Sequence, residues 1–509
     1  MRLALIALLA LATINAQQQH PRDKEIHDPT TRAWWHTTED LSSDAMEGRD
    51  TGSVAYNRAA DYVVNRFRQA GLQPAGDAGT FLQSVPMHEV AADPDHTTFT
   101  ILPATGPAVP LKFLQQVSLA PDTNLPSEFT APLTFRGYCG PETMQNIAGK
   151  IVVCFANRRQ GLPNAADRTT NARKGEAFGL LNVDDPYFSI EPSRWPAAYA
   201  RRVALGPAPT DKSKPFFVMT LSAELFPTLI AGTSQNAPAI LSAGGHKESL
   251  PSFEIPAQLQ VHVQLTQRTY NSPNVLAQLP GSDPTLKNEY IVIAAHLDGY
   301  GYGTPVNGDN LYNGALDDAA YVALLIQFAD DLHRTHQSLK RSILFCGFTG
   351  EEKGLLGANY FVEHPTIPLA QLAADVNLDQ LRPLFPLRIL TALAIDDTTL
   401  GDTARQIGST MGIELRPDRE PERALLRRAD HYPFLHAGIP AIGFILGYDP
   451  GTDAERRYRE WYQIRYHRPQ DDLKQPLDFD AATKFNSFFY RLIENLADAP
   501  TRPSFKRTQ

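Results

Sequence analysis

Histidine and acidic residues follow apolar runs, or a loop rich in glycine and asparagine, at several points in the C-terminal half of the 509-residue chain. They are His296 at the end of YIVIAAH, Asp317 and Asp318 in NGALDDAA, Glu351 and Glu352 after SILFCGF, Asp379 at the end of ADVNLD, and His467 in RYHRPQDD. Two histidines together with several carboxylates form a set of donor atoms that suits zinc. These residues could hold a metal ion if the fold brings them together.

From about residue 270, apolar runs alternate with helical patterns. The expected strands are NVLAQLPG, YIVIAAH, RSILFCGF, ADVNLD and RILTALA, and the expected helices are DDAAYVALLIQFADDLHR, GLLGANYFVEH and a last one over about 479–497. This alternation predicts an α/β sheet covered by helices. Open α/β sheets build their sites at the carboxyl ends of strands, where His296, Glu351 and Asp379 would stand.

Taken one at a time, these residues have ordinary structural explanations. An aspartate at a strand end is more often a helix cap or a turn residue, and an exposed pair of glutamates is usually solvated. The joint pattern differs, because most candidates stand at the same end of successive elements. From the residues alone, a metal site and a set of separate structural residues are equally good interpretations.

The composition excludes several classes of protein. Apolar residues make up 42% and charged residues 20% of the chain, as in ordinary globular proteins. The formal net charge is −9, and no basic run suggests a nucleic-acid partner. The three cysteines are too few for a disulfide framework. Cys139 and Cys154 could form one bridge, but two isolated thiols are the favoured interpretation.

Residues 1–16, MRLALIALLALATINA, combine one basic residue with an apolar run and a small residue, Ala16, before Gln17. This pattern is typical of a secretory signal peptide. The run is too short to remain as a membrane anchor, and no later run is long enough to span a bilayer. We expect an exported protein, periplasmic or extracellular, with no stable membrane insertion after the signal is removed.

A set of longer segments occurs in a fixed order over about residues 290–472. These are AAHLDGYG, GDNLYNGALDDAA, LFCGFTGEEKGLLGANYF, VNLD, RADHYPFLHAGIPAIGF and YHRPQDD. Together they resemble the M28 family of zinc peptidases, and MEGRDTGS with AADYVVNRFRQAGLQPAG resembles the entry segment of that family. The short β-rich runs RGYCG, IAGKIVVCFA and ARKGEAFGLLNV resemble a protease-associated (PA) domain.

The resemblance implies a helix/mixed β-sheet/helix sandwich of the zinc exopeptidase type, with an inserted mostly β, PA-like domain. After the signal peptide, we expect the N-terminal part of the catalytic domain over 25–125 and the insert over 126–268. The main catalytic domain would follow over 269–500.

The resemblance also implies a centre with two zinc ions per chain. His296 and Asp379 would bind one zinc, Glu352 and His467 would bind the other, and Asp317 would bridge the two. Two zinc ions at such a site share a water molecule and lower its pKa.

Three more residues have implied roles beside the metal ions. Glu351 would be the general base of the reaction. Asp298 would hold the His296 imidazole through its other ring nitrogen. Tyr466 would donate a hydrogen bond to the oxyanion, or would simply pack beside His467.

The chain departs from the family pattern at two places. Asp318-Ala319-Ala320-Tyr321 stands where the family often has Asn-Ala-Ser-Gly, and Tyr321 is expected on the packing face of its helix. Gln380-Leu381-Arg382 stands where the family often has Met-Val-Gly. Arg382 could contact a substrate carboxylate, but a surface position is the favoured interpretation.

The resemblance predicts a di-zinc exopeptidase acting on peptides, most simply an aminopeptidase. A carboxypeptidase or dipeptidase of the glutamate carboxypeptidase type is the alternative, with Arg382 and the cluster Arg423, Arg427 and Arg428 as candidates to bind a terminal carboxylate. A solvated helix face is the preferred interpretation of that cluster. A glutaminyl cyclase, or an inactive peptidase that binds a partner, fits less well because the ligand set and Glu351 are intact. The sequence leaves the oligomeric state and the side-chain preference open.

Overall fold

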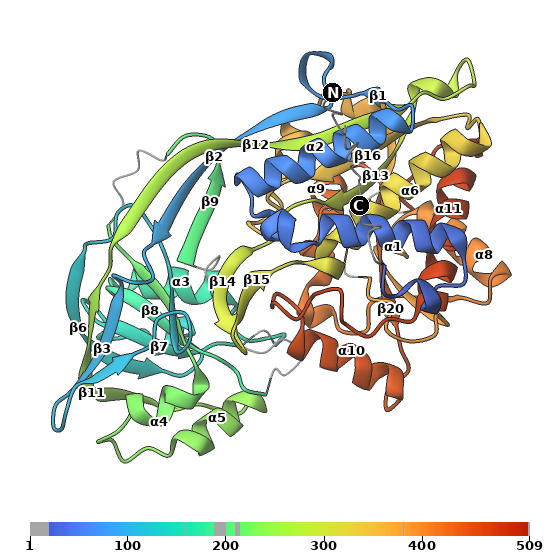
Figure 1. Cartoon of the computed structure of the whole chain (residues 1–509). Helices are drawn as coiled ribbons and strands as arrows, with labels where there is room; N and C mark the ends of the chain where they lie inside the picture. The colour runs from blue at the N-terminus through green and yellow to red at the C-terminus, as the bar shows by residue number, and fades with distance from the viewer. Residues whose placement is uncertain (1–19, 158, 188–199, 209–213, 380, 507–509) are drawn as a thin grey trace, which may run out of the picture.

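The computed structural model describes residues 20–157, 159–187, 200–208, 214–379 and 381–506 (Figure 1). The expected signal peptide, residues 1–16, lies outside these ranges. The described residues form a ten-stranded sheet, an eight-stranded sheet and the two-stranded ribbon of β14 (Gly301–Val306) and β15 (Asp309–Tyr312). Within the same ranges, every helix falls short of the length or the apolar character that a membrane span requires.

The ten-stranded sheet, called the main sheet below, is mixed. Its order is β19-β18-β20-β17-β13-β16-β12-β2-β9, with β1 paired to β12. β13 lies parallel to both β16 and β17, so the carboxyl ends of these three strands meet at one edge. The strands are β1 (Gln73–Pro74), β2 (Leu82–Ala92), β9 (Arg201–Leu205), β12 (Leu265–Leu279), β13 (Tyr290–His296), β16 (Ser342–Phe348), β17 (Leu372–Asn377), β18 (Ile389–Leu393), β19 (Glu414–Arg416) and β20 (Ala441–Gly447).

Helices cover both faces of the main sheet. Along β13, Ile291 and Ile293 enter one hydrophobic core while Val292 and Ala294 enter the other, as the two-residue period of a strand requires. The first core includes α1 (Pro29–Leu41), α2 (Val54–Gln69), α6 (Ala320–Thr335), α8 (Thr399–Thr410), α10 (Asp453–Ile464) and α11 (Phe479–Asp498). The second includes α7 (Leu356–Glu363) and α9 (His431–His436). The predicted α/β class, with helices on both sides of a mixed sheet, is confirmed.

The last helix shows why the apolar pattern predicts these elements well. Asp478 caps α11 by accepting a hydrogen bond from the main-chain nitrogen of Ala481. Phe485, Phe489 and Leu492 then recur at helical spacing and are fully buried. The helix ends at Asp498, one residue beyond the predicted end.

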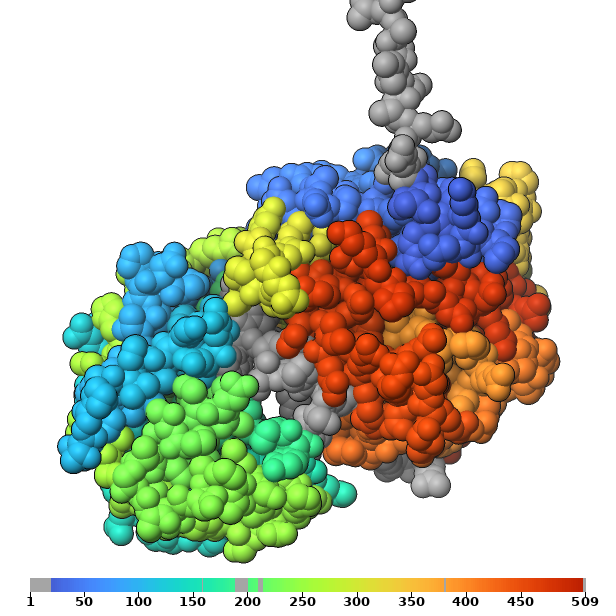
Figure 2. Space-filling view, turned by 60° about the horizontal axis from the view of Figure 1, so that its bottom comes forward, coloured from blue at the N-terminus to red at the C-terminus, as the bar shows by residue number. Residues whose placement is uncertain are grey.

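The eight-stranded sheet, called the inserted sheet below, forms a separate lobe, and the chain passes between this lobe and the main sheet at β2, β9 and β12 (Figures 1 and 2). Its order is β4-β3-β11-β6-β7-β8-β10-β5, with β6, β7, β8 and β10 parallel. Its strands are β3 (Thr98–Pro103), β4 (Val109–Leu111), β5 (Val117–Ala120), β6 (Glu128–Arg136), β7 (Ile151–Phe155), β8 (Gly179–Val183), β10 (Phe217–Leu221) and β11 (Ser252–His262), with helices α3 (Ala165–Lys174), α4 (Phe226–Leu229) and α5 (Ala237–Gly245). Its likeness to a PA domain stays a prediction.

The predicted boundaries of the insert, 126–268, are wrong at both ends. β3, β4 and β5 pair into the inserted sheet, so it begins at Thr98. At the other end, β11 finishes at His262, and residues 265–268 already belong to β12 of the main sheet. Turns within and between domains have the same composition, so the sequence does not mark where the inserted sheet begins.

The favoured interpretation of two isolated thiols is also wrong. Cys139 and Cys154 form a disulfide, with their α carbons 5.6 Å apart. Cys139 follows β6 and Cys154 lies on the neighbouring strand β7, so strand pairing brings the two residues together. Cys346 on β16 is a free, buried cysteine.

Candidate metal centre

The five residues predicted to bind metal come from separate elements that meet at the carboxyl edge of the main sheet. His296 ends β13, Glu352 follows β16, Asp379 follows β17, Asp317 lies in the turn before α6, and His467 lies between α10 and α11. All five side chains are buried. The parallel pairing of β13 with β16 and β17 explains this convergence, because it places their carboxyl ends side by side.

Asp317 lies between the two histidines. Its Oδ1 is 3.3 Å from Nε2 of His296, and its Oδ2 is 3.5 Å from Nε2 of His467. The two oxygens of one carboxylate therefore face two different imidazoles, as a carboxylate that bridges two ions must do. The turn that holds Asp317 begins after Gly314, whose φ of +60° suits glycine, and whose added Cβ would lie 2.4 Å from the carbonyl oxygen of Asp317.

The remaining ligand atoms fall into two groups around Asp317. Nε2 of His467 is 3.2 Å from Oε2 of Glu352. His296, Asp318 and Asp379 offer ligand atoms that lie within 4.8 Å of one another. His296, Asp317 and Glu352 form a second group within the same limit, and Asp318 joins the first group although the resemblance assigns it no role. Oδ2 of Asp318 accepts a hydrogen bond from the main-chain nitrogen of His296 at 3.1 Å.

Several of these buried polar atoms have no hydrogen-bond partner among the residues that the structure describes. They are Nε2 of His296, Oδ2 of Asp317, Oδ1 of Asp318 and Oε1 of Glu352. Leaving such atoms buried and unpaired is costly, so a native structure normally supplies a partner. A cation would supply it here, and two imidazoles with carboxylates are the donors that zinc prefers. The residues therefore fit a zinc centre.

Asp298 supports the centre mainly through its main chain and its neighbours. Nδ1 of His296 is 3.1 Å from the carbonyl oxygen of Asp298 and 3.7 Å from its Oδ1. The carboxylate of Asp298 instead accepts hydrogen bonds from Glu351 N at 3.0 Å and from Thr51 Oγ1 at 2.9 Å. Asp298 thus lies beside the predicted nitrogen, but its carbonyl, rather than its carboxylate, is the nearer acceptor.

Two tyrosines flank His467. The ring of Tyr466 stacks on the imidazole with the centroids 3.6 Å apart, and its hydroxyl accepts a hydrogen bond from Nη2 of Arg428 at 2.9 Å. Its role at an oxyanion stays a prediction. Sequence reasoning missed Tyr300, whose hydroxyl is 3.0 Å from Nδ1 of His467 and so orients that ring. The only sequence signal was its place in AAHLDGYG, four residues after His296.

Asp471 is a second residue that sequence reasoning missed. Its two oxygens accept hydrogen bonds from the main-chain nitrogens of Leu316 and Asp317, each at 3.0 Å. Burial and the nearby charge of Asp317 raise the pKa of Asp471 to about 6. This carboxylate fixes the turn in which Asp317 lies. It stands in the segment YHRPQDD, where the acidic pair was the available signal.

The acidic groups of the centre differ in their electrostatics. Burial, reinforced by Asp379 and Glu352, raises the pKa of Glu351 well above its usual range, although His296 opposes the shift. Burial and Asp317 raise the pKa of Asp379 to about 6. Burial would also raise the pKa of Asp317, but Arg382 and the two histidines outweigh it and hold that pKa well below the usual value.

Arg382 is not the surface residue that the sequence favoured. Its side chain is 0% exposed, its Nη2 is 3.4 Å from Oδ2 of Asp317, and its guanidinium lies 4.5 Å from the ring centre of Trp461. Apolar neighbours of Arg382 in the sequence, Leu381 and Leu384, are buried as well, so this loop runs through the interior. Gln380 lies outside the described residues. Tyr321 is buried on its helix as predicted.

The arginine cluster near residue 425 is only partly a solvated face. Arg423 is buried and donates a hydrogen bond to the hydroxyl of Tyr458 at 2.8 Å, and Arg428 bonds to Tyr466. Arg427 is exposed. The solvated-face interpretation is therefore wrong for Arg423 and Arg428, because aromatic residues of the loop and α10 cover them.

A mixed sheet between helix layers, with histidines and carboxylates meeting at the carboxyl ends of its strands, defines a fold of the zinc exopeptidase class. Residues 274–493 match the model of peptidase family M28. The matched range contains every predicted ligand and Glu351.

Curated relatives match somewhat less than half of the chain. A "Probable zinc metalloprotease" of Pyrenophora tritici-repentis is 28% identical over 269 residues, which cover 46% of this chain and 59% of the relative. A "probable leucine aminopeptidase 2" of Aspergillus oryzae is 26% identical over 227 residues, which cover 42% of each chain. The chain thus spans about half the length of the curated relatives that it matches.

One solved structure resembles almost the whole chain. It is described as an aminopeptidase from Aneurinibacillus sp. strain AM-1, and it superposes with a TM-score of 0.61 at 18% identity. The match covers 94% of this chain and 96% of the other. At this identity the likeness shows a shared fold.

Proposed function

We propose that the chain is an exported di-zinc aminopeptidase that removes residues from the free N-terminus of peptides. The observation that carries this proposal is the position of Asp317, with one carboxylate oxygen toward His296 and the other toward His467. The direction of cleavage is the one named for the Aspergillus oryzae relative and for the Aneurinibacillus structure.

In this proposal each residue has one task. His296 and Asp379 would hold one zinc, Glu352 and His467 would hold the other, and Asp317 would serve both. Zinc bound there would supply a Lewis acid for the peptide carbonyl and for the attacking water. Glu351 takes a proton from that water and passes it to the amine that leaves.

The position of Glu351 supports its task as general base. Its carboxylate is buried, and its Oε2 is 3.9 Å from Nε2 of His296, so it faces the centre. Burial beside other carboxylates raises its pKa, and a base with a raised pKa accepts a proton more readily near neutral pH. Asp298 fixes its main chain through the hydrogen bond to Glu351 N.

The number of zinc ions is the first test. Elemental analysis of dialysed protein should find about two zinc ions per chain at this centre. Full activity with a single ion bound at the centre would contradict the paired arrangement.

The direction of cleavage is the second test. A peptide with a free N-terminus should lose residues from that end, and acetylation of its amine should abolish turnover. An otherwise identical peptide with an amidated C-terminus is the control and should be cleaved normally. Loss of C-terminal residues from the acetylated peptide would establish a carboxypeptidase instead.

Export is the third part of the proposal. The apolar segment that ends at Ala16 supports it, and so does the Cys139–Cys154 disulfide, since disulfides persist in oxidising compartments. N-terminal sequencing of the protein recovered outside the cytoplasm should begin at Gln17. Recovery of an intact N-terminus from the cytoplasm would contradict it.

A further inference from the structure

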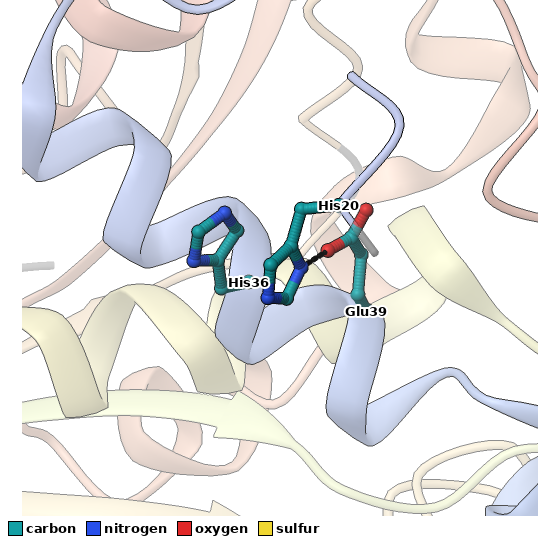
Figure 3. A group of neighbouring side chains, drawn as sticks. All are labelled: His20, His36 and Glu39. Atoms are coloured by element: carbon teal, nitrogen blue, oxygen red, sulfur yellow. Dashed lines mark hydrogen bonds and ion pairs between the residues drawn. The ribbon is translucent and has the colours of Figure 1, made fainter. Parts of the chain in front are cut away.

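Two histidines and a glutamate meet at helix α1, and none of them belongs to the candidate metal centre (Figure 3). His36 and Glu39 are three residues apart on α1, so they share a face of the helix. His20 precedes the short helix η1 (Asp23–Glu25), and the chain folds back so that its ring stacks on His36 with the centroids 3.5 Å apart. Nδ1 of His20 is hydrogen-bonded to Oε2 of Glu39.

The three side chains offer nitrogen and oxygen atoms that all lie within 4.8 Å of one another. Their side chains are 20% (His20) and 10% (Glu39) exposed, and His36 is 31% exposed, so an ion from solution can reach them. Oδ1 of Asp23 is 2.6 Å from Nε2 of His36 and is placed to orient that imidazole, as carboxylates do for histidines that bind metal.

We propose that His20, His36 and Glu39 form a second zinc site, separate from the catalytic centre. Two imidazole nitrogens and one carboxylate oxygen are a ligand set that zinc accepts, with water completing the coordination. The lone pairs of two stacked imidazole rings lie in parallel planes and do not point toward one common ion. Binding therefore turns the His20 ring out of the stack, and the partial exposure of this side chain leaves room for that rotation.

Zinc at this site ties the start of the described chain to α1. His20 lies four residues after the predicted cleavage point at Ala16, whereas His36 and Glu39 belong to a helix that packs on α6 and α11. The ion would hold the N-terminal segment against the helical layer and stabilise the folded chain, because it binds only where the fold brings its ligands together. This role does not depend on peptidase activity.

The test is a comparison of zinc content after equilibrium dialysis of the protein, with its catalytic centre intact, against zinc chloride. The variants His20→Asn, His36→Asn and Glu39→Gln should each bind about one zinc ion fewer than the unaltered protein. They should cleave peptides as the unaltered protein does. The matched control is His27→Asn, since the side chain of His27 is 83% exposed and lies outside the cluster; it should keep the full zinc content.

A second measurement covers the case in which a helix variant fails to fold. His20 lies outside any helix, so His20→Asn leaves α1 intact. Added zinc should raise the thermal midpoint of the unaltered protein more than that of this variant. Equal zinc content and equal thermal shifts in the variant and the unaltered protein would overturn the proposal. Loss of zinc from the catalytic centre would lower the zinc content of every protein by the same amount. The difference in zinc content between the variants and the unaltered protein would therefore remain.

Discussion

The two large sheets both contain neighbouring parallel strands, yet the polar residues at these strands differ in their hydrogen-bond and ion-pair partners. In the inserted sheet, Asp185 follows β8 and is paired with Arg159 at 3.0 Å, and Oδ1 of Asn182 accepts a hydrogen bond from Arg168 Nε at 3.0 Å. In the main sheet, the corresponding edge holds His296 and Glu352, and Nε2 of His296 and Oε1 of Glu352 lack a hydrogen-bond partner within the described ranges.

This difference shows that topology alone does not make a site. Parallel strands bring their carboxyl ends together in both sheets, but among the described residues it is the edge of the main sheet that leaves several carboxylate oxygens and one imidazole nitrogen buried without a hydrogen-bond partner. Because unpaired buried polar atoms are costly, such a cluster persists where an ion or substrate compensates the cost. The contrast between the two sheets can be tested by four changes, given in order of decreasing expected effect.

Asp317→Asn should have the largest effect. The neutral amide keeps the shape of the side chain but removes the charge that faces both His296 and His467, so zinc should be lost from both halves of the centre and activity should fall to background. Zinc content and kcat/KM measure this. Asp185→Asn, the matched change at a strand end of the inserted sheet, should keep both zinc ions and full activity; if it does not, the contrast between the sheets fails.

The two adjacent glutamates should separate proton transfer from metal binding. Glu351→Gln should retain zinc and lower kcat by about 10²–10⁴-fold, because the proton acceptor is removed. Glu352→Gln should instead lose zinc from one half of the centre, with partial recovery of activity when zinc is added. Metal content measured alongside kcat decides between them, and the opposite result would exchange the two roles.

Arg382→Met should strengthen zinc binding. The guanidinium lies 3.4 Å from Oδ2 of Asp317 and repels a cation that binds the same carboxylate. Removing its charge should lower the zinc dissociation constant by about tenfold. This factor corresponds to a small part of the Coulomb repulsion between the guanidinium and a cation at such a separation. Competition with a chelator measures the constant. Arg382→Lys keeps the charge and is the control; equal affinity in the Met and Lys variants would show that the charge does not act on the ion.

Replacing both Cys139 and Cys154 by serine should have the smallest effect on activity. Loss of the disulfide removes a constraint on the unfolded chain, and the free energy of unfolding of the inserted sheet should fall by about 2–4 kcal/mol. Zinc content and kcat should stay unchanged, because neither residue contacts the centre. Calorimetry and activity measurements together test this, and a large loss of zinc would show that the sheets are coupled.

Much of the main sheet can be predicted because its strands are long apolar runs. β13 has the predicted bounds, Tyr290–His296, and α11 differs by one residue, since burial on both sides of the sheet leaves a strong pattern. The start of the inserted sheet at Thr98 could not be predicted, because β3 and β4 are short and β3 pairs with β11, which lies far along the chain.

The residues of the candidate centre also fall into those that the sequence predicts and those that it does not. The ligands stand in recognisable segments, so resemblance to the family selects them. Tyr300, Asp471 and the buried position of Arg382 depend on how loops from distant parts of the chain pack, and a single sequence does not record this. Asp318 is among the candidate residues of the sequence, but the resemblance assigns a role to its neighbour Asp317 alone.

The hydrogen bond from Asp317 N to Asp471 spans 154 residues of sequence. During synthesis the ribosome adds about 5–20 residues per second, so Asp471 is added roughly eight to thirty seconds after Asp317. Throughout that interval the nascent chain lacks the carboxylate that fixes the Asp317 turn, and it lacks His467 until shortly before. A growing polypeptide therefore carries an unfinished, inert centre. If the proposed function is right, the order in which the chain is made would delay hydrolysis until synthesis is almost complete.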